Sequence, residues 1–217
     1  MNVEQARFNM IEQQIRPWEV LDQEVLDLLF AVKREEFVPP AYRPLAFADL
    51  EIPLGHGATM LAPKIEARML QELQVRPGDK VLEIGAGSGH MAALLAAKAE
   101  HVHSLEIEPA LAQMARENLH RQGFENVTVV EGDGARGWAA HAPYDVIVLS
   151  GSTPVLPPAF LQQLRAGGRL VAIVGDLPVM EMRLIVHNGE GAFESISILE
   201  TATAPLKNAL QASRFTF

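Results

Sequence analysis

The sequence has no cysteine among its 217 residues. Disulfide frameworks, cysteine-ligated zinc, iron–sulfur clusters and cysteine nucleophiles are therefore excluded. Basic residues are also scarce, because 18 lysines and arginines stand against 27 aspartates and glutamates, which gives a net charge of 18 − 27 = −9. This charge argues against broad binding to a nucleic-acid backbone or to a membrane surface, so neither is expected as a partner.

Long apolar runs and a targeting segment are lacking as well. The longest apolar stretches, such as Val146 to Leu149 and Leu170 to Val174, have the length of strands and are too short to span a bilayer. Residues 1–10 contain Glu4 and Arg7 and have no apolar h-region. We therefore expect a cytoplasmic protein.

The residue pattern changes once, near residues 76–79. Before this point it is mostly helical, with helices expected over 6–15, after Asp22 and over 63–73, and with an irregular segment over 41–62. After it, buried apolar strands alternate with helices, which indicates βαβ units and a parallel sheet. Strands are expected over 80–84, 101–106, 127–131, 144–149 and 169–174, and helices over 89–97, 109–122 and 158–164.

The C-terminal part has a different pattern. Residues 182–187 and 193–199 flank the turn sequence Asn188-Gly189-Glu190-Gly191, which predicts a β-hairpin. The predicted fold class is therefore α/β: a doubly wound, Rossmann-like sheet that is mostly parallel with an antiparallel C-terminal hairpin. An N-terminal helical extension precedes it.

The most informative motif is a strand that runs into Gly85, Gly87 and Gly89, with a helix after them. Glycines there let the backbone turn and approach a ligand closely. A dinucleotide fingerprint would need glycine at position 90, where this chain has His90, and a P-loop is excluded because no G-K-[ST] sequence follows. We expect His90 to cover the ligand or to pack, rather than to perform acid–base chemistry.

Acidic residues end the neighbouring strands. Glu106 lies 106 − 85 = 21 residues after Gly85, a spacing at which a carboxylate accepts hydrogen bonds from ribose hydroxyls. Asp133 stands between two glycines and can meet an adenine amino group, and Glu83 is expected to orient the glycine loop or to bind the ligand. Acidic lining without a phosphate cradle suits a cationic nucleoside, and the sulfonium S-adenosylmethionine fits. No group of histidines and carboxylates has metal-ligand spacing, so no metal is expected.

Several further segments carry a closer resemblance. The sequence Ile52–Thr59, followed by Pro63, is similar to the loop of protein-L-isoaspartate O-methyltransferases. The resemblance covers roughly residues 8–207 and implies S-adenosylmethionine-dependent methylation of isoaspartyl carboxylates in damaged proteins or peptides, the first step of their repair. It implies that residues 1–75 form the extension and the active-site loop and that residues 76–217 bind the cofactor, within one structural unit. Other matching segments are 37–39, 76–85, 132–134, 144–145, 157–158 and 164–170.

The loop departs from the family pattern at one position. The family reads T-I-S-x-P, with the serine taken as catalytic, whereas this chain has Leu61 at that place, two residues after Thr59. Leucine cannot donate a hydrogen bond to a carboxylate, a loss of about 1.5–3 kcal/mol. Ser152 and Thr153 stand where the family has small residues, so their hydroxyls are expected either to replace the serine or to select a different substrate. The candidate catalytic positions are Thr59, Leu61, Ser152 and Thr153.

Two other functions stay open at this point. One is a methyltransferase for another, unidentified carboxylate acceptor or a small metabolite, with Ser152 and Thr153 in the acceptor pocket. The other is a binding module that holds S-adenosylmethionine without turnover. Methyl transfer to an isoaspartyl peptide would distinguish the expected function from both.

Overall fold

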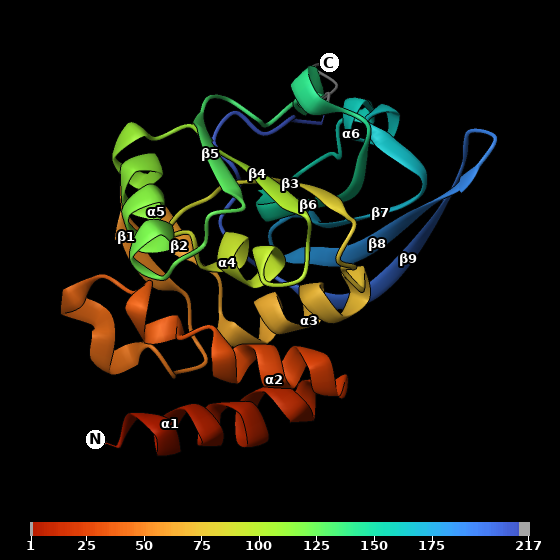
Figure 1. The fold of residues 1–217 in the computed structure, drawn as a ribbon. Coiled ribbons are helices and arrows are strands. Elements are labelled where there is room, and N and C mark those ends of the chain that lie inside the picture. Colours follow the sequence, from red (N-terminus) through yellow and green to blue (C-terminus); the bar gives the residue numbers. More distant parts are fainter. Residues whose placement is uncertain (1, 213–217) are drawn as a thin grey trace.

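The computed structural model describes residues 2–212. Within this range, seven strands form one sheet in the order β5-β4-β3-β6-β7-β8-β9 (Figure 1). Strands β3 to β7 run parallel, whereas β8 and β9 continue the sheet antiparallel. The predicted mostly parallel sheet with an antiparallel C-terminal hairpin is therefore confirmed. The strands are β3 (Lys80–Ile84), β4 (His101–Glu106), β5 (Val127–Glu131), β6 (Tyr144–Thr153), β7 (Leu164–Asp176), β8 (Val179–Gly189) and β9 (Ala192–Thr201).

The strand order reverses at β3, and this reversal positions the site. From β3 the chain passes to β4 and β5 on one side, and it then returns to β6 on the other side. The connections after β3 and β6 therefore leave in opposite directions, which opens a crevice beyond the carboxyl ends of these strands.

Helices cover both faces of the sheet, as a doubly wound fold requires. The alternation of side chains along β3 divides the core accordingly, because Val81 joins one apolar cluster while Leu82 and Ile84 join the other. One face of the sheet carries α3 (Pro63–Leu73), α4 (His90–Ala96) and α5 (Pro109–Arg121), and the other carries α6 (Pro158–Gln162) and the 3-10 helix Ala139–His141.

None of the helices in residues 2–212 has both the length and the apolar character that a bilayer crossing needs.

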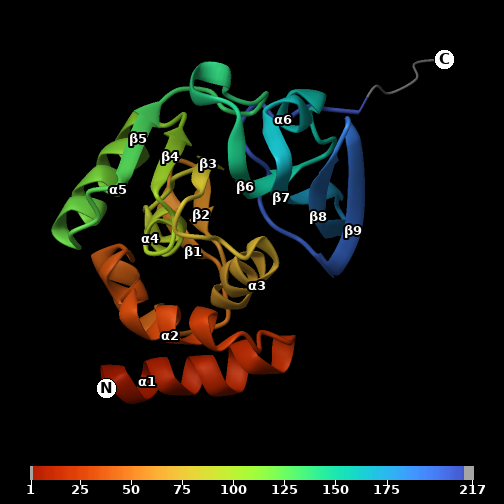
Figure 2. The same ribbon diagram turned by 45° about the vertical axis from the view of Figure 1, so that its right-hand side comes forward.

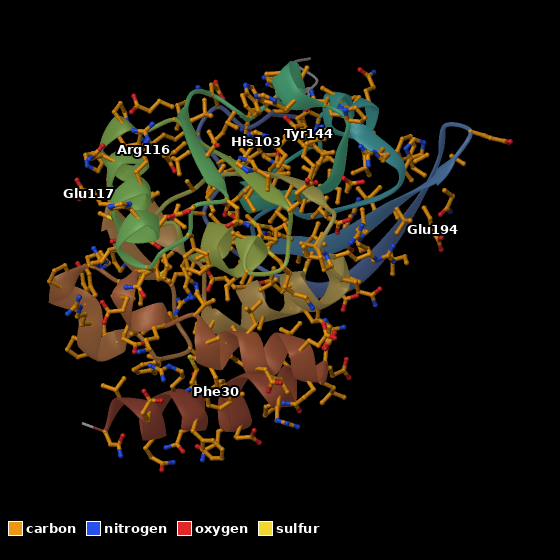
Figure 3. All side chains as sticks on the ribbon, viewed as in Figure 1. Phe30, His103, Arg116, Glu117, Tyr144 and Glu194 are labelled. Carbon is orange, nitrogen blue, oxygen red and sulfur yellow. The ribbon has the colours of Figure 1, made fainter. Side chains whose placement is uncertain are left out.

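The N-terminal segment forms the predicted helical extension. Helix α1 (Val3–Met10) continues through a π-helical turn to Ile15, and α2 (Gln23–Ala31) follows. Both helices form a layer below α3, on the side away from the strands (Figures 1 and 2). Phe8 of α1 and Phe30 of α2, the latter labelled in Figure 3, pair with ring centroids 6.4 Å apart. The buried residues of this layer share the apolar cluster of α3 and α4, so the extension packs directly on the core.

The segment 41–62 differs from the prediction, which expected irregular structure throughout. It starts within a 3-10 helix (Pro40–Leu45) and contains a two-stranded antiparallel hairpin of β1 (Ile52–Gly55) and β2 (Ala58–Met60). His56 stands in the tight turn with a φ of 54° and is flanked by glycines that also have positive φ. Strands of this length carry too few residues for an alternating pattern to stand out in the sequence.

A histidine cluster lies at the amino ends of the parallel strands, opposite the crevice. The ring of His103 stacks on His141 at a centroid distance of 4.3 Å, and His101 lies 4.7 Å away. Figure 3 shows His103 next to Tyr144, and their centroids are 6.4 Å apart. Burial, together with the charges of His141, His101 and Lys80, lowers the pKa of His103 to about 4. His103 is therefore neutral at pH 7 and packs as an aromatic side chain.

Candidate active site

A cleft with about 720 Å³ of empty volume opens at the carboxyl ends of the central strands. It brings together four residues that the sequence predicted as cofactor ligands, namely Gly85, Gly87, Glu106 and Asp133. Residues 203–207, which return to the sheet after β9, form another part of its lining. Among residues 2–212, no group of three or more histidines and acidic residues has the geometry of a metal site.

Glu106 ends β4 and is 6% exposed. Its carboxylate accepts hydrogen bonds from the backbone N–H of Gly87 at 2.9 Å and of Glu108 at 3.0 Å. These two bonds tie the end of β4 to the glycine loop and fix the direction of the carboxylate. Because an ionised carboxylate has about four acceptor positions, Glu106 can still accept hydrogen bonds from a diol in the cleft.

Asp133 follows β5 and faces the same cleft. One carboxylate oxygen accepts from the backbone N–H of Ala135 at 2.9 Å, and the other accepts from the side-chain amide of Asn208 at 2.9 Å. The first bond closes a local turn, and the second joins this turn to the C-terminal segment. Asp133 is thereby held on the side of the cleft away from the glycine loop.

The glycines of the loop have different surroundings. Gly85 has a φ of 95° and lines the cleft, where a side chain would meet Leu206. Gly89 does not line it, because it faces α5, and a Cβ there would lie 3.2 Å from Ala115 and Leu119. The structure thus gives Gly89 a packing role between α4 and α5 instead of the predicted ligand contact.

A smaller cavity, with about 270 Å³ of empty volume, shares Thr59, Gly85, Gly87 and Ser150 with the cleft. Leu61, which stands at the position of the family serine, lines this small cavity. The hydroxyl of Thr59 donates to Glu51 at 2.8 Å, so it is already engaged within the protein. The small cavity also contains Glu66, Glu83 and His90.

Ser152 and Thr153 are not brought to either cavity. Both are buried, and their hydroxyls donate to the backbone carbonyls of Thr203 at 3.0 Å and Val155 at 2.8 Å. The reason is that β6 continues through residue 153, where the segment 203–207 pairs with it and covers these side chains. Ser150, which the sequence analysis did not single out, provides the hydroxyl at this strand end.

Glu83 lies fully buried between two serines. Its carboxyl group accepts from Ser104 at 2.5 Å and from Ser150 at 2.9 Å. Burial raises the pKa of Glu83 to about 8, although the two serine hydrogen bonds lower it. Glu83 is therefore harder to ionise than an exposed glutamate, and it braces β3 against β4 and β6.

The raised pKa of Glu83 makes stability depend on pH. The unfolded carboxyl releases its proton near pH 4.5 and the folded one near pH 8, so Glu83 contributes stability below pH 4.5 that is lost as the pH rises to 8. Its share of the slope is about 1.4 kcal/mol per pH unit. Glu83→Gln should flatten this slope in urea unfolding measured from pH 5 to 8.5. An unchanged slope in the variant would show that Glu83 is ionised in the native state.

A buried charged network lies beneath the small cavity and was not predicted. Arg34 forms an ion pair with Glu66, and His90 Nδ1 lies 2.9 Å from the same carboxylate oxygen. Arg34 also donates to the backbone carbonyls of Ala46 at 3.0 Å and Leu61 at 2.7 Å, so it holds the active-site loop. The one signal for this network in the sequence was Glu66, a glutamate on the apolar face of the predicted helix 63–73.

Comparison with known proteins gives a consistent result. A protein from Koribacter versatilis named protein-L-isoaspartate O-methyltransferase is 40% identical over 200 residues, which cover 92% of this chain and 90% of that protein. A protein of the same name from Protochlamydia amoebophila is 45% identical over 178 residues, covering 82% and 84%.

Solved structures share the fold. A Plasmodium falciparum protein, assigned provisionally as a protein-L-isoaspartate O-methyltransferase and solved with S-adenosyl-L-homocysteine, superposes with a TM-score of 0.78 at 18% identity, covering 95% of this chain and 98% of that chain. A structure named protein-L-isoaspartate O-methyltransferase gives 0.75 at 25% identity, covering 94% and 65%. The sequence model of one family, described as protein-L-isoaspartate(D-aspartate) O-methyltransferase, matches residues 5–211. This chain therefore belongs to the protein-L-isoaspartate(D-aspartate) O-methyltransferase family.

Proposed function

We propose that the protein transfers the methyl group of S-adenosylmethionine to the carboxylate of isoaspartyl residues in proteins or peptides. The observation that carries the proposal is the meeting of Gly85, Gly87, Glu106 and Asp133 in one cleft beside the loop that contains Leu61. Membership of the family supports the same chemistry.

The proposal assigns a part of the cofactor to each of these residues. Glu106 accepts hydrogen bonds from the ribose hydroxyls, and Asp133 meets the adenine, because both side chains line the cleft. Gly85 and Gly87 would meet the methionine part with their backbone, because both line the cleft and a Cβ there would lie only 3.2 Å from Leu206 or 3.1 Å from Leu54. When bound, the cofactor supplies an electrophilic methyl group on a sulfonium.

The transfer demands little acid–base chemistry from the protein. An isoaspartyl carboxylate is ionised at neutral pH, so no base has to activate it. One carboxylate oxygen attacks the methyl carbon, and the electron pair of the carbon–sulfur bond stays on sulfur. The contribution of the protein is to align the two reactants and to exclude water. The loop 55–63, with Thr59 and Leu61, is placed to do this.

The measurement that tests this function is methyl transfer from labelled S-adenosylmethionine to an isoaspartyl peptide. Wild type should be weakly active, because Leu61 offers no hydrogen bond. Leu61→Ser should raise kcat/KM roughly 10-fold or more, since a donor then faces a charged acceptor in a dry cleft. Leu61→Ala is the matched control, because it creates space without adding a donor.

The outcomes separate the alternatives. Binding of S-adenosylhomocysteine without transfer to isoaspartyl peptide, in wild type and in Leu61→Ser, would contradict the proposed acceptor. Transfer of the labelled methyl group to another carboxylate compound, offered in place of the peptide, would then identify a different methyltransferase. The leucine at position 61 favours this alternative. Full activity of wild type that does not respond to Leu61→Ser would show that no donor is needed at this position.

A further inference from the structure

His90 is a polar residue of the small cavity, and one of its ring nitrogens is left without a partner. It is 2% exposed and lines the cavity together with Leu61. Its Nε2 has no hydrogen-bond partner among residues 2–212. Other buried side-chain atoms in this range also lack partners, but none of them belongs to a residue that lines the cleft or the small cavity.

The other ring nitrogen of His90 faces a fixed negative charge. Nδ1 lies 2.9 Å from Glu66, and Arg34 pairs with the same carboxylate oxygen. Burial raises the pKa of Glu66, but the charges of His90 and Arg34 outweigh burial and lower it. Glu66 is therefore an ionised acceptor. The imidazolium form of His90, which carries hydrogens on both ring nitrogens, can donate to Glu66 and to a second acceptor at once.

Three neighbouring groups cannot receive an incoming anion in the same way. Thr59 donates to Glu51, and Ser150 donates to Glu83. Leu61 has no donor in its side chain, and its backbone carbonyl accepts from Arg34. Arg34 donates its hydrogen bonds to the carboxylate of Glu66 and to the backbone carbonyls of Ala46 and Leu61. Among the side-chain nitrogens that line the small cavity, His90 Nε2 is the one without a partner in residues 2–212.

We propose that His90, held by Glu66 and Arg34, binds a carboxylate in the small cavity. A buried hydrogen bond between charged partners is among the stronger ones that a protein makes.

Two carboxylates can reach this position. One is the α-carboxylate at the methionine end of the cofactor, since the small cavity shares Gly85 and Gly87 with the cleft. The other is the carboxylate of the acceptor, since Leu61 lines the same cavity. The inference rests on the proposed function, because both groups belong to its reactants.

Titration calorimetry with two ligands distinguishes these sources. S-adenosylhomocysteine carries the α-carboxylate, whereas 5′-methylthioadenosine lacks the amino-acid end. If the cofactor supplies the carboxylate, His90→Leu should weaken S-adenosylhomocysteine binding by roughly 10-fold or more and leave 5′-methylthioadenosine within about 2-fold. If the acceptor supplies the carboxylate, the affinities of His90→Leu for both ligands should equal those of wild type. In that case KM for the isoaspartyl peptide should rise by roughly 10-fold.

A conservative variant separates this role from simple packing. His90→Gln keeps an N–H donor near the position of Nε2 and should retain most of the affinity that His90→Leu loses. Should His90→Leu fail to fold, His90→Phe serves in its place, because it keeps an aromatic ring against Phe37 without an N–H donor and should produce the same selective loss. Wild-type values for both ligands and for KM in these variants would overturn the inference. A wild type that does not bind S-adenosylhomocysteine would instead overturn the proposed function.

Discussion

Arg34→Met should destabilise the protein by about 3–5 kcal/mol, the cost of leaving one partner of a buried ion pair uncompensated. Arg34 and Glu66 are each 2% exposed, so water cannot solvate the glutamate that remains. The two backbone carbonyls of Ala46 and Leu61 also lose their donor. Urea unfolding measures the loss, and for a protein of this size the midpoint temperature should fall by roughly 10 °C.

The double variant Arg34→Met/Glu66→Gln is the matched control. The neutral amide no longer leaves a buried charge, and it can still accept a hydrogen bond from His90. The double variant should therefore be more stable than Arg34→Met alone. In a double-mutant cycle this result would appear as a strong coupling energy between the two sites. Equal stability of the single and double variants would mean that water reaches Glu66 in the native protein.

Glu106→Ala should weaken the binding of S-adenosylhomocysteine by about 1.5–3 kcal/mol, roughly 10- to 150-fold in Kd. The variant removes the carboxylate that would hold the ribose, and it also frees the N–H of Gly87 from the bond that orders the glycine loop. Titration calorimetry on the folded variant gives the change directly.

Glu131→Ala provides the control for this measurement. Glu131 pairs in register with Glu106 at the end of the neighbouring strand β5, but it is half exposed, faces Arg116 and does not line the cleft. Its removal should leave the affinity unchanged. If both variants bind equally well, the ribose lies elsewhere and the orientation of the cofactor assigned to this cleft is wrong.

The sequence predicted the parts of the fold that depend on local pattern. The strands 80–84, 101–106 and 127–131 have the predicted bounds, because short runs that contain valine, leucine or isoleucine between turn residues mark strands. The same logic placed Glu106 and Asp133, since the carboxyl ends of parallel strands share one edge.

The missed features depend on contacts between distant segments. Arg34 and Glu66 are 32 residues apart in the chain, and neither position alone indicates a buried pair. Ser152 and Thr153 were predicted in the site because nothing in the local sequence shows that β6 extends to residue 153. The local sequence also does not show that residues 203–207 cover this end of the strand. A shift of two residues along that strand would have identified Ser150, which does line the cleft.

The return of residues 203–207 to β6 has a consequence for how the protein is made. The backbone of Ser152 exchanges hydrogen bonds with Ala204 and Leu206, and the Leu206 side chain lies against Gly85 and Gly151. On the ribosome, these residues emerge after every other part of the cleft, so a nascent chain can assemble its sheet before it has a complete nucleoside site. Ligand binding therefore stabilises chains translated past this point more than chains that stop at β9, which lack this part of the cleft lining.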